Sequence, residues 1–222
     1  MLAKLRTYSL LGIEALPVEV EVDVSAAALP KTVLVGLPEA AVRESTHRVE
    51  RALVNSGFVR PSDRVVINLA PADLPKQAAS FDVPIALGTL AGSGQLTGDR
   101  FEKYAVVGEL ALDGSTRTTK GALSMAIAAA KQDGVIGLVV PSPNASEAAV
   151  VEGVEVFGVS SLAQAAAFFA GTIDLEPHAS RIEQLFDEYS TYDADFADVR
   201  GQEMAKRAVL IAASGSHNLF ML

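Results

Sequence analysis

Residues 18–24 alternate strictly between apolar and polar side chains, which sets the strongest local limit on the fold. A valine stands at every even position, and an acidic residue separates each valine from the next. Successive side chains of a strand point to opposite faces, so this period of two predicts a strand with one face in a core and the other in water. Residues 5–14 are the expected hairpin partner, with the turn at Leu16-Pro17.

Strand-like and helix-like patterns then follow one another as far as Gly171. Further strands are expected at 32–37, 63–70, 135–141 and 153–159, with a hairpin over 105–119 that turns at Asp113-Gly114. Helices are expected at 38–57, 82–92, 121–132, from 144 onward and at 161–170. Alternating strands and helices favour parallel pairing, whereas the opening hairpin is antiparallel. The first 171 residues are therefore expected to form one α+β domain with a mixed sheet.

The composition changes after Gly171. Residues 172–198 hold eight of the 27 acidic residues and one of the 18 basic residues, and they show no strong periodicity. A short helix is expected near 179–189. The elements expected beyond this segment are a helix over 201–213, a stop at Gly215 and a strand over 217–222. The predicted organisation is a domain over 1–171, an acidic linker over 172–198 and the start of a second domain over 199–222.

Charge and residue usage exclude several classes of site. The chain has no cysteine and three scattered histidines, so neither a disulfide framework nor a metal site is expected. The formal net charge is −9, and the first 171 residues lack the clustered basic residues of a general nucleic-acid clamp. Arg43, Arg48 and Arg51 share one face of the expected helix 38–57. Acidic residues lie among them, so we expect a solvated face with ion pairs.

The sequence also predicts where the protein works. No apolar run approaches the ~18 residues that a membrane-spanning helix needs. The N-terminus lacks a basic-then-apolar signal followed by a small-residue cleavage site. We therefore expect a cytoplasmic protein without membrane contact, which agrees with the absence of cysteine.

The stretch VRGQEMAKRAVLIAASGSHNLFML, residues 199–222, resembles the beginning of an AAA+ ATPase module of the magnesium-chelatase kind. In that family the strand leads into a G-x-x-x-x-G-K-[ST] phosphate loop, whose glycines and lysine hold the nucleotide phosphates. No such loop occurs in the 222 residues. The resemblance predicts a phosphate loop within about ten residues beyond Leu222, and no ATP hydrolysis by this chain alone.

Three more segments carry a resemblance that covers essentially the whole chain. VVINLAPADLPK, FDVPIALGTLAGSGQL and VVGELALDGSTRTTKGAL occur in the same order in the ComM (YifB) family of magnesium-chelatase-like AAA+ proteins. The resemblance implies a Lon-protease-like domain over 1–171, with the α+β fold of the second domain of ribosomal protein S-five. The recombination ATPase RadA shares such a domain but begins with a cysteine zinc ribbon, which this chain lacks. Magnesium-chelatase subunits proper lack the front domain, so metal insertion into porphyrin is not the expected activity.

The same resemblance implies a function for a longer protein. Family members are expected to use ATP and Mg and to form a ring, most simply a hexamer. The ring is expected to move branched or single-stranded DNA by branch migration in recombination or natural transformation. Val199, Gly201 and Gln202 match the family segment that packs beside the adenine. No cofactor is expected on these 222 residues alone, and residues 1–171 would hold the ring together or position DNA.

Ser80 follows the Pro75-Lys76 turn at the position of the nucleophile in Lon-type peptidases. Those enzymes pair the serine with a lysine, because a serine hydroxyl needs a base to accept its proton. Leu123 stands where that lysine is expected, and leucine cannot act as a base. Lys76 and Lys120 are expected at exposed turns, where a lysine keeps its ordinary pKa and is a poor base. We therefore expect no catalytic residue in this chain.

A structural role is the expectation for the remaining candidates. Ser80 or Asp82 is expected to cap the helix over 82–92 with a side-chain oxygen. The three histidines, at positions 47, 178 and 217, are expected to be structural or solvated. Two alternatives stay open at this point, namely a peptidase that uses Ser80 and an interaction module that binds a partner protein and never touches DNA.

Overall fold

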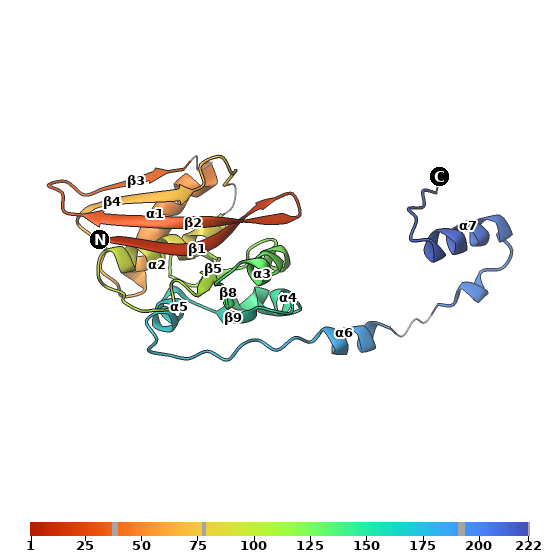
Figure 1. Ribbon diagram of the computed structural model, residues 1–222. Helices are drawn as coiled ribbons and strands as arrows, with labels where there is room; N and C mark the ends of the chain where they lie inside the picture. The colour runs from red at the N-terminus through yellow and green to blue at the C-terminus, as the bar shows by residue number, and fades with distance from the viewer. Residues whose placement is uncertain (37–39, 77–78, 191–193, 222) are drawn as a thin grey trace. The chain divides into compact units, whose positions relative to one another are not determined.

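The computed structural model describes residues 1–36, 40–76, 79–190 and 194–221 (Figure 1). The chain divides into two compact units, Met1–Arg181 and Ile182–Leu222. The first unit contains the sheet and its covering helices, and the second contains short helices only within the described residues.

A seven-stranded mixed sheet forms the centre of the first unit, in the order β3-β4-β2-β1-β5-β8-β9. Its strands are β1 (Leu2–Leu11), β2 (Glu14–Ser25), β3 (Lys31–Val35), β4 (Arg64–Ala70), β5 (Tyr104–Val106), β8 (Gly137–Pro141) and β9 (Glu155–Val159). β2 runs antiparallel to β1 and β4, whereas β3–β4, β1–β5, β5–β8 and β8–β9 are parallel pairs. This arrangement confirms the predicted antiparallel ribbon at the start and the parallel portion in the second half.

The turn of the first hairpin lies at Gly12-Ile13, so the predicted turn at Leu16-Pro17 was wrong. Gly12 has a φ of +64°, a conformation that glycine adopts without a steric penalty. The period-two pattern placed β2 correctly, but it did not show that the strand continues back through the proline to Glu14.

Pro17 is tolerated inside β2 because its nitrogen faces an unpaired edge. Met1 and Val24 bond to each other through their backbones, and this pairing fixes the alternation along the β1–β2 ladder. Pro17 stands opposite Tyr8, at a position whose backbone groups point away from β1. β4 pairs with β2 only from Glu19 onward, so the proline removes no ladder hydrogen bond.

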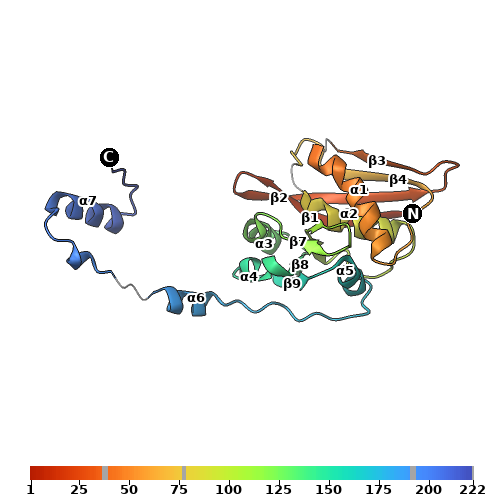
Figure 2. The same cartoon turned by 180° about the vertical axis from the view of Figure 1, so that it is seen from behind.

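Helices cover both faces of the sheet (Figures 1 and 2). The helices of the first unit are α1 (Ala40–Asn55), α2 (Asp82–Gly92), α3 (Ala122–Lys131), α4 (Ala145–Ala148) and α5 (Leu162–Phe169). One core contains residues of α1, α2 and α5, and a second core contains residues of α3 and α4. Along β8, Val139 belongs to the first core while Leu138 and Val140 belong to the second. Burial on both faces is typical of parallel strands.

Two predicted helices lie where the sequence pattern placed them. The helix expected over 38–57 is α1, and its four predicted core residues, Val42, Val49, Ala52 and Leu53, are buried. Residues 38 and 39 lie outside the described residues. α2 has the predicted bounds, 82–92, and Pro84 lies in its first turn, where an N–H would have no helical partner.

The second hairpin is shorter than predicted. Its strands are β6 (Glu109–Leu110) and β7 (Thr116–Arg117). The expected hairpin over 105–119 was wrong at its start, because the segment from Ala105 is β5 and pairs with the main sheet. Gly114 has a φ of +84° in the turn. The carboxylate of Asp113 accepts hydrogen bonds from the amide and hydroxyl of Ser115, at 2.9 and 2.6 Å.

The first unit extends past Gly171 to Arg181. Arg100 holds the added segment by donating a hydrogen bond of 3.0 Å to the carbonyl of Ile173. The amide of His178 donates a hydrogen bond of 2.7 Å to a carbonyl of β9. Composition shows the acidic character of this segment but not these backbone contacts.

The second unit contains α6 (Ile182–Tyr189), the 3-10 turn η3 (Phe196–Asp198) and α7 (Glu203–Ser214). α7 confirms the helix expected over 201–213. The strand expected over 217–222 does not form over 217–221, and Leu222 lies outside the described residues. A strand needs a neighbour for its backbone groups, and the described part of this unit offers none. No described helix is long and apolar enough to cross a membrane.

Candidate functional site

The segment between β4 and α2, residues 71–81, and the first residue of α2, Asp82, contain the residues that the sequence singled out for chemistry. The segment ends in the 3-10 turn η1 (Ala79–Phe81), which leads directly into α2. Residues 77 and 78 lie outside the described residues. The described part of this stretch brings Lys76, Ser80 and Asp82 into the interior of the first unit, where each is buried.

Ser80 is 2% exposed, and its Oγ has no hydrogen-bond partner in the described structure. Its carbonyl accepts a hydrogen bond of 2.9 Å from the amide of Gly108, and the carbonyl of Gly108 accepts one of 3.0 Å from Val83. These two bonds fasten the start of α2 to the segment before β6. The backbone of Ser80 is thus anchored, while its hydroxyl faces neither solvent nor a described base.

Neither Ser80 nor Asp82 caps α2, so the capping prediction was wrong. The N-cap position is Phe81, whose φ and ψ of −84° and −7° are already helical, and no side chain makes a cap hydrogen bond. The chain enters α2 through a continuous 3-10 turn. The amide of Val83 therefore bonds to Gly108, and the carboxylate of Asp82 points to other partners.

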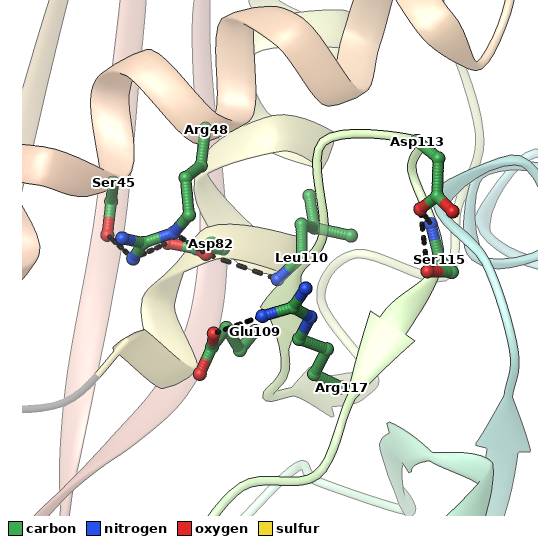
Figure 3. A network of polar contacts seen from close by, with 8 residues as sticks. All are labelled: Ser45, Arg48, Asp82, Glu109, Leu110, Asp113, Ser115 and Arg117. Atoms are coloured by element: carbon green, nitrogen blue, oxygen red, sulfur yellow. Dashed lines mark hydrogen bonds and ion pairs between the residues drawn. The ribbon is translucent and has the colours of Figure 1, made fainter.

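The carboxylate of Asp82 is the centre of a buried polar network (Figure 3). Its Oδ2 accepts a hydrogen bond of 3.0 Å from Nε of Arg48 on α1, and its Oδ1 accepts one of 3.3 Å from Nη2. Oδ2 also accepts a hydrogen bond of 3.1 Å from the amide of Leu110 in β6. Nη2 of Arg48 donates in addition to Oγ of Ser45, at 3.2 Å. The network joins α1, α2 and β6.

Burial controls the protonation of this network. Asp82 is fully buried, and removal of its carboxylate from water raises its pKa, although hydrogen bonds from Arg48, Ser45 and Leu110 oppose the rise. The hydrogen bond to Asp82 raises the pKa of Arg48, so the guanidinium keeps its charge. A fork of two N–H groups on one carboxylate fixes the angle between two helices, which indicates a structural clamp.

Arg48 does not belong to a solvated basic face, so that prediction was wrong for this residue. Its side chain turns inward to Asp82, which is 34 residues away in sequence. Arg51 is exposed, as predicted, and the side chain of Arg43 lies outside the described residues. The main partner of Arg48 is thus distant in sequence, and a helical pattern alone does not reveal it.

Lys76 is buried, whereas the sequence predicted an exposed turn. Its Nζ donates a hydrogen bond of 3.0 Å to the carbonyl of Gly36 and another to the carbonyl of Pro71. Burial lowers the pKa of this amine, and the charge of Asp73 opposes the shift. The described contacts of Nζ are with backbone carbonyls and not with the hydroxyl of Ser80, so the two residues do not form a hydrogen-bonded dyad.

The second candidate lysine, Lys120, and the position of the missing base, Leu123, lie near the start of α3. Lys120 is exposed, as predicted. Leu123 is 38% exposed, and its amide donates a hydrogen bond of 3.2 Å to Oε1 of Glu147. The structure thus leaves Leu123 at the surface of a helix, while Ser80 is buried at the start of another.

The segment expected beside the adenine lies in the second unit. Val199 is exposed, and its carbonyl accepts a hydrogen bond of 3.2 Å from Nζ of Lys206. Gly201 and Gln202 have positive φ values of 68° and 55°, and Gln202 directly precedes α7. The backbone therefore makes a tight left-handed bend before this helix.

The histidines are dispersed over the described residues. His47 is exposed on α1, and Nε2 of His178 lies 3.0 Å from Oγ of Ser146. The amide of His217 donates a hydrogen bond of 2.8 Å to the carbonyl of Ala212. Within the described residues no group of three or more His, Asp or Glu side chains could hold a metal ion.

Two models of protein families match the sequence. Residues 20–144 match the model described as subunit ChlI of Mg-chelatase. Residues 195–222 match the model described as magnesium chelatase, subunit ChlI. The first match covers more than half of the chain and runs from β2 to η2 (Ser142–Asn144), so it includes the network around Asp82.

Curated relatives match nearly all of the chain. It is 40% identical over 222 residues to the YifB proteins of Salmonella typhimurium and Escherichia coli. It is 38% identical over 213 residues to the competence protein ComM of Haemophilus influenzae. These matches cover 100% and 96% of this chain, but 42% and 41% of the relatives. The chain therefore spans about two fifths of the length of these relatives.

Proposed function

Because the chain belongs to the magnesium-chelatase-like family that includes YifB and ComM, we propose that it forms the N-terminal, non-catalytic part of an ATP-driven DNA motor. The motor is a ring of identical subunits, expected to be a hexamer, that promotes branch migration on branched or single-stranded DNA in the cytoplasm. The similarity to a competence protein supports a role in the uptake or recombination of DNA.

The first unit is a Lon-protease-like domain that has lost its chemistry. Ser80 keeps the position of the nucleophile, but its hydroxyl is buried without a base within hydrogen-bonding distance among the described residues. The Nζ of Lys76 donates its hydrogen bonds to two backbone carbonyls, and Leu123 has no basic group. A serine without a partner to accept its proton is a poor nucleophile. The burial of this hydroxyl without a base is the observation on which the non-catalytic role rests.

The second unit supplies the link to ATP. Residues 195–222 match the magnesium-chelatase model, and Val199, Gly201 and Gln202 precede α7. We assign these three residues to the adenine side of the nucleotide site. These residues can contribute only the adenine side of a nucleotide site, because the phosphates and Mg require the glycines and lysine of a phosphate loop. In the longer protein such a loop would supply phosphoryl chemistry, and residues 199–202 would orient the base.

A DNA-binding comparison tests the role of the first unit. The longer protein and a variant without residues 1–181 are titrated onto forked DNA in a gel shift, with ATP hydrolysis as the check on folding. We expect removal of the unit to weaken binding at least tenfold while ATP hydrolysis without DNA persists. Equal binding by the two proteins would reject a DNA-positioning role and favour a module that binds only a partner protein.

A further inference from the structure

A groove of about 530 Å³ lies beside the N-terminal half of β1. Residues 1–4 line one side, and residues 96–99 with Phe101 and Glu102 line the other. The groove exists because β1 pairs with β2 from Leu2 to Leu11, whereas its pairing with β5 is limited to Arg6 and Ala105. The first residues of β1 therefore have a sheet neighbour on one edge only among the described strands.

The register shows which backbone groups face the groove. Met1 and Val24 exchange hydrogen bonds, so the odd-numbered residues of β1 bond to β2. The N–H and C=O groups of Leu2 and Lys4 then point to the opposite edge, because bonding alternates along an antiparallel ladder. No described strand pairs with them there. An open edge of this kind is a template for another strand.

The side chains of the groove combine an apolar floor with an acidic rim. Ala91 and Leu96 are buried at its base, and Met1 is 63% exposed at its mouth. Asp99 and Glu102 are exposed on the rim. The ammonium of Lys103 lies 3.8 Å from the carboxylate of Asp99, and both groups are exposed. An exposed ion pair of this kind is weak, so Lys103 offsets little of the negative charge of Asp99.

The lysine of β1 does not neutralise this rim. The ammonium of Lys4 is bound by the carboxylates of Glu19 and Glu21 of β2, each at 2.8 Å. Its positive charge is therefore held over β2, which pairs with the edge of β1 opposite the open one. The N-terminal ammonium of Met1 is likewise held by β2, where it donates to a backbone carbonyl and lies 3.8 Å from the carboxylate of Asp23. With both cations bound to β2, the two carboxylates at the rim favour an occupant that carries a positive charge.

We propose that this groove binds an extended segment of a partner protein, which adds to β1 as a further strand and places a basic side chain between Asp99 and Glu102. The open N–H and C=O groups of Leu2 and Lys4 bond to its backbone. The apolar floor receives the side chains that alternate with the basic ones. At ~3.3 Å per residue, the edge from Leu2 to Lys4 accommodates about three to four residues of the segment.

Two synthetic peptides test the proposal on the full chain, with any affinity tag at its C-terminus because Met1 lines the groove. The probes are acetyl-Lys-Val-Lys-Val-Lys-amide and its counterpart with glutamate in place of lysine. Binding is followed by fluorescence anisotropy, and its location by hydrogen exchange of the backbone amides. We expect saturable binding of the lysine peptide, at least tenfold weaker binding of the glutamate peptide, and slowed exchange in residues 1–5.

Variants separate the backbone from the charge contribution. Leu2→Pro removes an N–H that faces the groove and none that bonds to β2, so binding should fall at least tenfold while the unfolding midpoint stays near that of the wild type. Asp99→Asn with Glu102→Gln should remove the preference for the lysine peptide. Glu152→Gln, an exposed acid outside the groove, is the matched control and should bind normally.

Four results would overturn the proposal. The first is the absence of saturable binding of either peptide, and the second is protection that maps away from residues 1–5. The third is self-association of the chain through this edge, seen by analytical ultracentrifugation, with no peptide binding. If Leu2→Pro does not fold, normal binding by the double rim variant would also overturn it. None of these results depends on the DNA or ATP activity of the longer protein.

Discussion

The guanidinium of Arg48 on α1 holds the buried carboxylate of Asp82 at the start of α2 through two hydrogen bonds, of 3.0 and 3.3 Å. The same carboxylate accepts a hydrogen bond from the amide of Leu110, so two helices and the second hairpin meet at one side chain. A buried ion pair with further hydrogen bonds has a large effect when one partner is removed, because the other charge stays in the interior.

Replacement of Arg48 by methionine should lower the free energy of unfolding by about 3 to 5 kcal/mol, since it leaves Asp82 buried without its counter-charge. Urea unfolding followed by circular dichroism measures the change. Arg51→Met, at an exposed position on the same helix, is the control and should change stability by less than about 0.5 kcal/mol. Equal effects of the two substitutions would mean that the clamp does not stabilise the fold.

The pH dependence of stability should report the raised pKa of Asp82. The usual pKa of an aspartate is 3.8, and burial raises the pKa of Asp82 in the folded state above this value. At a pH between the unfolded-state pKa and the folded-state pKa, the folded state therefore binds more protons than the unfolded state. The contribution of Asp82 to the free energy of unfolding is then highest at low pH. It falls as the pH rises through the folded-state pKa and levels off above it. The free energy of unfolding is measured for the wild type and for Asp82→Asn from pH 3.5 to 7, and the wild-type value minus the variant value isolates this contribution. If this difference grows as the pH rises, folding lowers the pKa of Asp82 instead of raising it.

Two buried serines should respond in opposite ways to replacement by alanine. Oγ of Ser9 donates a hydrogen bond of 2.6 Å to the carbonyl of Pro75, whereas Oγ of Ser80 has no described partner. Ser9→Ala should cost about 1 kcal/mol of stability, and Ser80→Ala should add about 1 kcal/mol by removing an unsatisfied buried hydroxyl. Thermal unfolding of both variants gives the comparison. A loss of stability in Ser80→Ala would indicate that its hydroxyl is satisfied in solution.

A fluorophosphonate probe should not label Ser80 in the folded protein. The probe reacts with an exposed serine whose proton is accepted by a base, and Ser80 is buried without one among the described residues. Mass spectrometry of the treated protein, with a serine peptidase as the positive control, measures the modification. Labelling at Ser80 that disappears in Ser80→Ala would restore the peptidase interpretation.

Local patterns predicted most elements of the first unit for clear physical reasons. The alternation around Val20 fixed the buried face of β2, and the proline at position 84 could be read as part of a first helical turn. The hairpin turn was misplaced because proline is a frequent turn residue and is rare inside a strand. Pro17 is harmless in β2 because the pairing of β2 with β4 begins two residues later, at Glu19. That depends on the sheet order and not on the local sequence.

The candidate site was less accessible to sequence reasoning. Ser80 and Leu123 could be singled out from their positions, but the burial of Lys76 could not, because its partners are backbone carbonyls of Gly36 and Pro71. The pair of Arg48 and Asp82 was also missed. One signal was present, since Asp82 is an acid at the start of an otherwise apolar helix, and a buried acid needs a cation or several donors.

Branch migration by the longer protein is the most direct measure of what residues 1–181 contribute to the motor. A mobile four-way DNA junction is incubated with ATP and either the longer protein or a variant without residues 1–181, and the rate of product formation is measured alongside ATP hydrolysis without DNA. We expect the variant to hydrolyse ATP at a similar rate but to lose at least nine tenths of its branch migration, whereas Ser80→Ala in the complete protein keeps it. Branch migration at the full rate without residues 1–181 would show that the first unit is not needed by the motor, and its loss in Ser80→Ala would show that the hydroxyl of Ser80 takes part.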